Sequence, residues 1–188
     1  MLKKGGGFPE KYSTKRKRIL WKVTRVSFII SFRMISIIPI TVNDRFFGIE
    51  IDQVVEIITQ KEFFLVPKVP EFTIGLVNIR GEIVPVFSLS SILFGKKAQM
   101  TELILQNLVV CRVNEKKLCF FVDKIYKVVY VKEENIKNYA ENIWKDVKFI
   151  KYFVEIEEFE NLIGVLDVEN IVNYIDNSNR EFYKAVRR

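Results

Sequence analysis

The chain has 188 residues, 49% of them hydrophobic and 13% aromatic, so it can bury a substantial core as one domain or two small ones. It carries 30 Lys and Arg against 23 Asp and Glu, a formal net charge of +7, and it has no histidine. The missing histidine excludes Ser-His-Asp triads and histidine metal sites, whereas carboxylate chemistry stays open.

The first 33 residues carry the positive charge. They hold ten Lys and Arg and a single acidic residue, Glu10, while the rest of the chain has 20 basic and 22 acidic residues and is close to neutral. The apolar stretch 26–42 is interrupted by Arg33 and Pro39, and neither piece has the roughly 20 apolar residues of a membrane-spanning helix. We therefore expect a cytoplasmic protein without membrane insertion. Either residues 1–33 form a poorly ordered basic extension, or Met34 is the functional start.

The chain from Met34 onward is rich in Val, Ile, Phe and Tyr, which favours a mainly β fold. Two prolines in residues 66–70 predict a loop, and SSILFGKK (90–97) predicts a short helical turn closed by Gly95. Residues 52–58 continue the apolar pattern after the second strand. The predicted strands of this half are 35–42 and 46–51, joined by the turn VNDR, followed by 76–79 and 83–89.

The second half shows the same alternation of short apolar runs and turns. Apolar residues at helical spacing predict one amphipathic helix at 133–147, and residues 170–188 are expected to be helical or frayed. The predicted strands are 108–113, 118–122, 128–131, 149–156 and 162–166.

Two cysteines, Cys111 and Cys119, flank the predicted hairpin CRVNEKKLC. If Val113 pairs with Leu118, the two sulfurs point to opposite faces of the hairpin, which argues against a disulfide. We expect both to be buried, reduced thiols.

The two halves of the chain contain a weak internal repeat. Residues 51–58 (I-D-x-V-x-x-I-I) match residues 122–129 (V-D-x-I-x-x-V-V), and residues 83–89 align loosely with 162–168. A β-rich chain with two similar halves indicates two small barrels that share a core.

No set of catalytic side chains can be assembled from this sequence. The two cysteines lack a base, GGG at 5–7 has no strand before it, and the acidic run EIEEFEN fits a solvated hairpin turn better than a metal site. We therefore expect no enzymatic activity, no metal and no cofactor. This favours a binding or scaffolding protein.

The stretch GLVNIRGEIVPVFSL (75–89) interrupts an apolar strand pattern with Arg80-Gly81 and Pro85. Gly81 suits a backbone conformation closed to other residues, Gly75 suits a close approach of strands, and Pro85 indicates an edge or a bulge. We interpret the stretch as two strands joined by a turn.

With its flanks, FFGIEIDQVVEII before and LFG after, this stretch resembles the CheW-like family of chemotaxis coupling proteins. The family pattern has an apolar-Gly-apolar-acidic strand, V-x-E-I, a proline-bearing connector and G-x-x-N-x-R-G-x-x-x-P-V-x-x-L. Phe121-Val122-Asp123 and Leu166-Asp167 resemble later family elements, whereas Tyr152 stands where the family usually has glycine. The resemblance covers about residues 34–176 and leaves the extension 1–33 and the basic tail 177–188 outside.

The resemblance implies a mainly all-β fold of two interlocked five-stranded SH3-like barrels, with short helices and a C-terminal helix. The first barrel is expected at about 45–105 and the second at about 106–166, closed by the terminal segments. It also implies a non-enzymatic scaffold that joins chemoreceptor (methyl-accepting chemotaxis protein) cytoplasmic tips to the regulatory domain of the CheA histidine kinase. That domain has the same fold, so kinase and coupling protein are expected to alternate in rings at receptor arrays under the inner membrane.

The resemblance also points to site residues. Glu56 and Arg80 match a pair that meets within the first barrel, and the helical receptor tip is expected in the groove between the barrels. The matching positions for receptor or kinase binding are Val54, Val55, Glu56, Ile57, Gly75, Asn78, Arg80 and Gly81.

Three other interpretations remain open at this point. The first is a CheW-like adaptor for a different receptor–kinase array. The second is a small-barrel RNA-binding protein that uses the basic extension as an electrostatic arm, although the near-neutral barrels give no reason to expect nucleic acid. The third is a membrane-surface protein that binds through KRKRILWKVTRVSFIISF.

Overall fold

The computed structural model describes residues 34–60, 62–95, 106–137, 148–159 and 161–186, which belong to one compact unit, Phe32–Arg188. The predictions for residues 1–33 and for most of the helix at 133–147 lie outside the described residues. No helix in the described part of the chain is long and apolar enough to cross a membrane.

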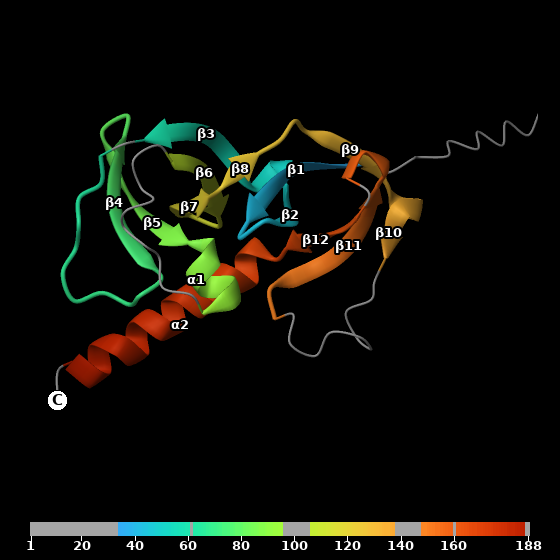
Figure 1. Cartoon of the computed structure of the whole chain (residues 1–188). Coiled ribbons are helices and arrows are strands. Elements are labelled where there is room, and N and C mark those ends of the chain that lie inside the picture. The colour runs from blue at the N-terminus through green and yellow to red at the C-terminus, as the bar shows by residue number, and fades with distance from the viewer. Residues whose placement is uncertain (1–33, 61, 96–105, 138–147, 160, 187–188) are drawn as a thin grey trace, which may run out of the picture. The chain divides into compact units, whose positions relative to one another are not determined.

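The described strands form two sheets (Figure 1), which confirms the predicted mainly β fold. The seven-stranded sheet has the order β10-β11-β12-β2-β1-β8, with β9 also paired to β1. Its strands are β1 (Met34–Val42), β2 (Arg45–Glu50), β8 (Lys124–Ile125), β9 (Val129–Lys132), β10 (Ile136–Lys137), β11 (Ile150–Ile156) and β12 (Asn161–Leu166).

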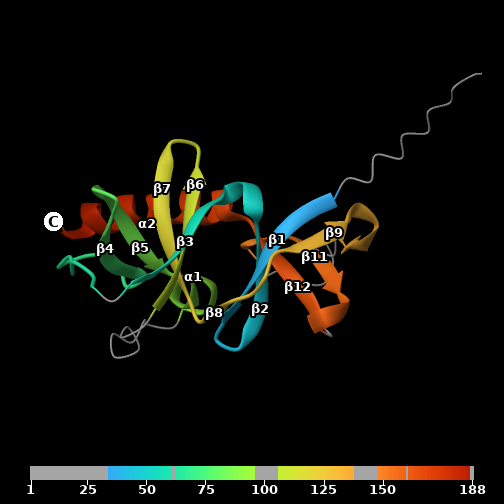
Figure 2. The same ribbon diagram turned by 90° about the horizontal axis from the view of Figure 1, so that it is seen from above.

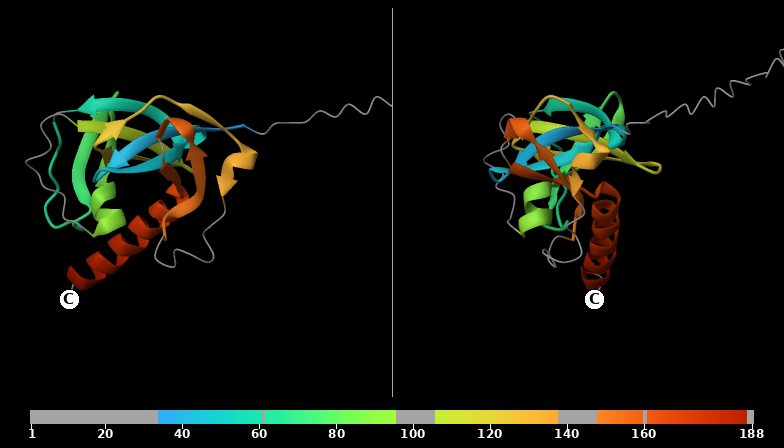
Figure 3. Two further views of the ribbon diagram at one scale, coloured as in Figure 1. Left: turned by 45° about the vertical axis from the view of Figure 1, so that its right-hand side comes forward. Right: turned by 90° about the vertical axis from the view of Figure 1, so that its right-hand side faces the viewer.

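The second sheet has five strands in the order β3-β6-β7-β5-β4. They are β3 (Val54–Gln60), β4 (Thr73–Ile79), β5 (Glu82–Ser88), β6 (Gln106–Val113) and β7 (Lys116–Val122). The helices are α1 (Leu89–Phe94), α2 (Val168–Val186) and the one-turn 3₁₀ helices η1 (Ile51–Gln53), η3 (Glu133–Asn135) and η4 (Glu157–Phe159). Both α-helices lie on the lower side of the molecule, below most of the strands, in the views of Figures 1 and 3.

The sheets are interlocked because the chain changes sheet twice. It leaves the seven-stranded sheet at η1 and returns to it at Asp123, between β7 and β8. Both crossovers fall in the internal repeat, at the start of its matched segments 51–58 and 122–129. The repeat therefore marks the two places where the chain changes sheet. The expected barrel limits near residues 45 and 105 do not coincide with them: β2 pairs with β1, and β6 and β7 pair with β3 and β5 of the five-stranded sheet.

One apolar cluster joins the two sheets to α1 and α2, and we call it the shared core. The amphipathic helix α2 contributes its buried face to this cluster, so one mass of apolar side chains holds the whole described unit together. Its buried members are Ile38, Ile40, Val42, Ile49, Phe72, Phe87, Leu89, Ile92, Val109, Cys111, Val113, Leu118, Phe120, Val122, Phe149, Leu166, Val168, Ile171, Val172 and Ile175.

Tight turns set the register of the β1–β2 and β4–β5 hairpins. Asn43 and Asp44 join β1 to β2 with φ angles of 51° and 58°, and Arg80 and Gly81 join β4 to β5 with φ angles of 53° and 90°. Two-residue turns with both φ angles positive match the right-handed twist of the strands. The predicted turn at Arg80-Gly81 is therefore confirmed, and Gly81 occupies the position that strains other residues most.

The cysteine hairpin has a different register from the predicted one. Val113 pairs with Lys116 and Cys111 pairs with Leu118, because a two-residue turn suffices to join β6 and β7. The two thiols still lie on opposite faces: Cys111 belongs to the shared core and Cys119 to a separate core of the five-stranded sheet. Both are free, and burial raises the pKa of each to about 12, which fits inert thiols.

The helix predicted at 133–147 is wrong in its described part. Glu133–Asn135 form one 3₁₀ turn, and Ile136–Lys137 form β10, which pairs with β11. Ile136 packs against the core of the seven-stranded sheet, so strand pairing and burial outweigh the helical spacing of the apolar residues. The C-terminal helix begins two residues earlier than predicted, where the Asp167 carboxylate accepts a hydrogen bond from the Asn170 amide at 2.9 Å.

Candidate functional site

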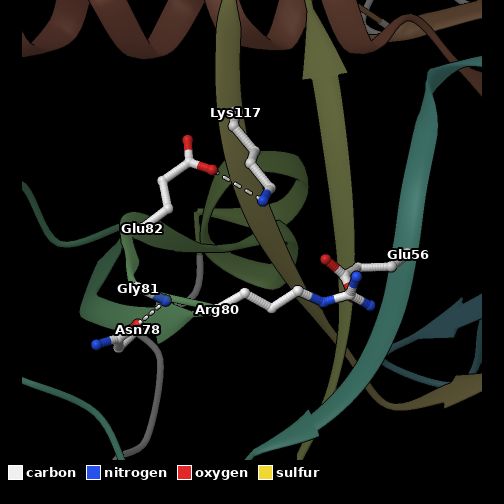
Figure 4. Close-up of polar contacts among 6 residues, drawn as sticks. All are labelled: Glu56, Asn78, Arg80, Gly81, Glu82 and Lys117. Atoms are coloured by element: carbon white, nitrogen blue, oxygen red, sulfur yellow. Dashed lines mark hydrogen bonds and ion pairs between the residues drawn. The ribbon is translucent and has the colours of Figure 1, made fainter.

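The expected pair between Glu56 and Arg80 forms in the structure. A guanidinium Nη of Arg80 donates to Glu56 Oε2 at 2.9 Å (Figure 4). Glu56 lies on β3, at one edge of the five-stranded sheet, and Arg80 lies in the turn that starts at β4, the other edge. The Asn78 side chain accepts a hydrogen bond from the Gly81 amide at 2.8 Å and supports this turn. The ion pair therefore links β3, one edge strand of this sheet, to the turn that follows β4, the other edge strand.

The pair leaves the arginine open to a partner. The Arg80 side chain is 83% exposed and that of Glu56 is 19% exposed. A second ion pair, Lys117 to Glu82 at 3.0 Å, lies beside it in Figure 4. Exposed ion pairs contribute about 0–1 kcal/mol to stability, so the Glu56–Arg80 contact orients the guanidinium more than it stabilises the fold. Most of the guanidinium donors can reach an acceptor on another molecule.

Strand β3 contains a bulge next to Glu56, and exposed apolar residues flank Glu56 along the strand. Val54 is opposite Cys111 and Glu56 is opposite Val110, so Val55 is the extra residue of the bulge. Ile57 is opposite Val109, a member of the shared core, so it lies on the face of the sheet turned to that core. At β3, an edge strand, no other part of the described chain covers this face, so Val55 is 43% and Ile57 is 47% exposed.

The seven-stranded sheet also extends the face that it turns to the shared core. Side chains alternate along β1, so Met34 and Ser36 share the face of Ile38 and Ile40, which are buried in the shared core. Tyr130 of β9 is opposite Ser36 and is 67% exposed, and Met34 is 48% exposed. Both sheets thus extend the face of the shared core into solvent.

We call this set of exposed residues the apolar margin. Strands β3, β8 and β9 run along the upper edge of Figure 1, on the side away from α1 and α2, and they face the viewer in Figure 2, which shows the molecule from above. The apolar margin consists of Met34, Ile51, Val55, Ile57, Val128 and Tyr130. The sequence alone did not reveal Met34, Ile51, Val128 and Tyr130 as site residues. The available signal was the alternation of side chains between the two faces of strand 34–40. Only the pairing of β9 with β1 shows that Met34 and Tyr130 lie on the same face.

Two of the expected site residues have supporting positions. A Cβ at Gly75 would lie 2.6 Å from the Phe64 carbonyl oxygen, because Phe64 and Leu76 exchange two backbone hydrogen bonds of 2.9 Å. Gly75 is therefore needed for the connector to approach β4, as predicted. Val54 packs against the shared core. Val55, Glu56, Ile57, Asn78, Arg80 and Gly81 are the expected residues that the structure brings to the surface around the ion pair.

Pro85 also has a local explanation. Strand β5 pairs with β4 along its length but with β7 only from Val86 to Ser88. At Pro85 the strand therefore has a neighbour on one side only, which confirms the predicted edge position, because proline lacks the amide that a second neighbour would need.

The chemistry of this surface is that of binding. It offers exposed apolar side chains, one guanidinium with unused donors and backbone held by two sheets. Among the described residues, no group of three or more Cys, Asp and Glu side chains is arranged to hold a metal ion. Apolar anchors beside a directional donor suit a partner with an apolar face and a polar or acidic group.

One solved structure resembles this fold, and two named proteins resemble this sequence. The fold resembles the crystal structure of the scaffolding protein TtCheW from Thermoanaerobacter tengcongensis, with a TM-score of 0.60 and 21% identity over 71% of this chain and 88% of that chain. The chain is 27% identical over 139 residues to the chemotaxis protein CheW of Helicobacter pylori, covering 74% of this chain and 82% of that protein.

A second relative and the family profile agree on the extent of the similarity. The chemotaxis protein CheW of Thermotoga maritima is 23% identical over 141 residues, or 74% of this chain and 88% of that protein. The profile of the CheW-like domain matches residues 36–176, which include both sheets and the first half of α2. The chain therefore belongs to the CheW-like family of chemotaxis adaptor proteins.

Proposed function

We propose that this protein is a non-enzymatic cytoplasmic scaffold that couples the cytoplasmic tips of chemoreceptors to a CheA-type histidine kinase. The observation that carries this proposal is an exposed apolar margin together with an exposed Arg80 guanidinium, in a chain of the CheW-like family. A receptor tip is a helical hairpin, and amphipathic helices bind through apolar anchors laid on an apolar surface.

The site residues take different parts in this proposal. Val55 and Ile57 contact the apolar face of the receptor tip, and Arg80 donates to an acceptor on it. Glu56 holds the guanidinium in place, and Asn78 and Gly81 shape the turn that carries it. Val54 and Gly75 support the strands beneath.

The kinase is the second proposed partner. Its regulatory domain resembles this chain in fold, so contacts between similar barrels generate rings in which coupling protein and kinase alternate. The scaffold then links receptors into arrays at the inner membrane. Its own contribution is geometric: it fixes the distance and orientation between receptor and kinase without performing a chemical step.

Reversing the charge of Arg80 tests the receptor site. Arg80→Glu removes the donor and places a second carboxylate beside Glu56, so we expect at least about tenfold weaker binding to a receptor hairpin fragment. The free energy of unfolding should change by less than about 1 kcal/mol, because the lost ion pair is exposed. Titration calorimetry measures the affinity, and urea denaturation measures the stability.

Lys116→Glu is the matched control, because Lys116 forms an ion pair with Asp176 of α2, away from the apolar margin. It should bind the fragment as the wild type does. The double variant with Glu56→Arg and Arg80→Glu can restore the ion pair but inverts its direction, so it should not recover binding. Unchanged affinity of Arg80→Glu, or full recovery in the double variant, would contradict a direct contact by Arg80.

A further inference from the structure

Glu50 is the only acidic residue among those described that is buried, with 9% of its surface exposed. It is the last residue of β2, directly before the crossover to the five-stranded sheet. Its carboxylate accepts hydrogen bonds from Tyr152 Oη at 2.6 Å and from Lys151 Nζ at 2.9 and 3.1 Å. Both donors belong to β11, 101 and 102 residues further along the chain. We call these three residues the Glu50 cluster.

A bulge in β11 lets two successive side chains reach the same carboxylate. Successive side chains of a regular strand point to opposite faces, so Lys151 and Tyr152 would ordinarily diverge. The register shifts between Ile150, opposite Leu166, and Tyr152, opposite Val165. The extra residue turns the strand locally and re-aims its side chains, as bulges do.

The Glu50 cluster satisfies a group that is costly to bury. An ionised carboxylate taken out of water needs charged or strong donors around it. Lys151 supplies charge and Tyr152 supplies a hydroxyl from a ring buried in the core of the seven-stranded sheet. Burial and the hydrogen bond to Glu50 raise the pKa of Tyr152, so the phenol remains a donor at physiological pH. Tyr152, where the family usually has glycine, thus has a defined contact here.

The conformation of the crossover between the sheets depends on the contacts of the residues at its two ends, Glu50 and Glu56. Helix η1 has no side-chain cap at Glu50 and buries none of its three residues. Glu50 fixes its start to β11, and Glu56 fixes the strand after it to the β4–β5 turn. Two exposed members of the apolar margin, Ile51 and Val55, lie between these two carboxylates.

We propose that the Glu50 cluster is a positioning device that holds the crossover in the conformation in which the apolar margin binds the receptor tip. Lys151 and Tyr152 act through Glu50 and do not touch the partner. The receptor part of this inference rests on the proposed function. The structural part, that the cluster fixes Ile51–Val55, does not.

Hydrogen exchange tests the structural part without any partner. Tyr152→Phe removes the hydroxyl and keeps the buried ring, so the fold should remain. Losing a hydrogen bond to a carboxylate should make local opening of the crossover easier. We therefore expect the amides of residues 51–55 to exchange about tenfold faster, while those of β6 and β7 stay at wild-type rates. Lys151→Met should act in the same direction. Lys116→Met, which breaks the ion pair with Asp176, is the control and should leave the crossover unchanged. Wild-type exchange at 51–55 in both cluster variants would overturn the inference.

Affinity for the receptor hairpin fragment tests the second part. Both cluster variants should bind severalfold more weakly than the full wild-type chain, at a temperature where circular dichroism shows all proteins fully folded. Faster exchange at 51–55 with unchanged affinity would refute the positioning role in receptor binding. If the wild-type chain itself does not bind the fragment, the proposed function fails, and the exchange result still decides whether the cluster fixes the crossover.

Discussion

Replacing Phe120 by alanine is expected to lower the free energy of unfolding by about 3–5 kcal/mol. Phe120 is fully buried in the shared core, on β7, opposite Val109 of β6 and Phe87 of β5. Removing its ring leaves a cavity where the two sheets and α2 meet, and close-packed surroundings can fill such a cavity only in part.

Urea denaturation followed by circular dichroism measures this loss. Phe120→Leu, which keeps most of the volume, should cost less than about 1.5 kcal/mol and remain measurable if the alanine variant does not fold. Tyr183→Ala on α2 is the control, because Tyr183 is 46% exposed. Because the core is shared, all variants should unfold in one transition. A loss below about 1 kcal/mol for Phe120→Ala, or a shift of only one of two transitions, would contradict a common core.

Replacing Ile57 by aspartate is expected to produce the largest loss of receptor binding. Ile57 is 47% exposed at the middle of β3, next to Glu56 in the strand, and it extends the face of the shared core. A charge there cannot be buried under an apolar helix, so the affinity for a receptor hairpin fragment should fall by about 100-fold, as for a central interface residue.

The fold should tolerate this change, because the side chain already faces solvent. Leu162→Asp is the matched control: Leu162 is 40% exposed on β12, outside the apolar margin. Its affinity should equal that of the wild type. Equal losses in the two variants, or none in Ile57→Asp, would show that the apolar margin is not the receptor site.

Local features of this protein could be predicted where neighbours in sequence decide them. The turn at Arg80-Gly81, the edge position of Pro85 and the cap at Gly95 follow from backbone rules that involve only a few residues. The Glu56–Arg80 pair was expected from the resemblance to the CheW-like family, and the structure contains it.

Features that depend on distant strands could not be predicted. The Glu50 cluster joins residues about a hundred positions apart through a bulge that has no clear sequence signal. Tyr130 and Met34 become part of the apolar margin only because β9 pairs with β1. The same cause explains the error at residues 136–137, where pairing with β11 overrides helical spacing.

Under the proposed function, this chain transmits control from receptor to kinase. The direct measurement is the autophosphorylation rate of a CheA-type kinase mixed with vesicles that display receptor cytoplasmic hairpins, with and without the full chain. We predict that the receptor changes the kinase rate only when the chain is present, and that Ile57→Asp abolishes this effect while Leu162→Asp preserves it. An identical kinase rate with and without the chain, in the presence of both partners, would contradict this coupling role.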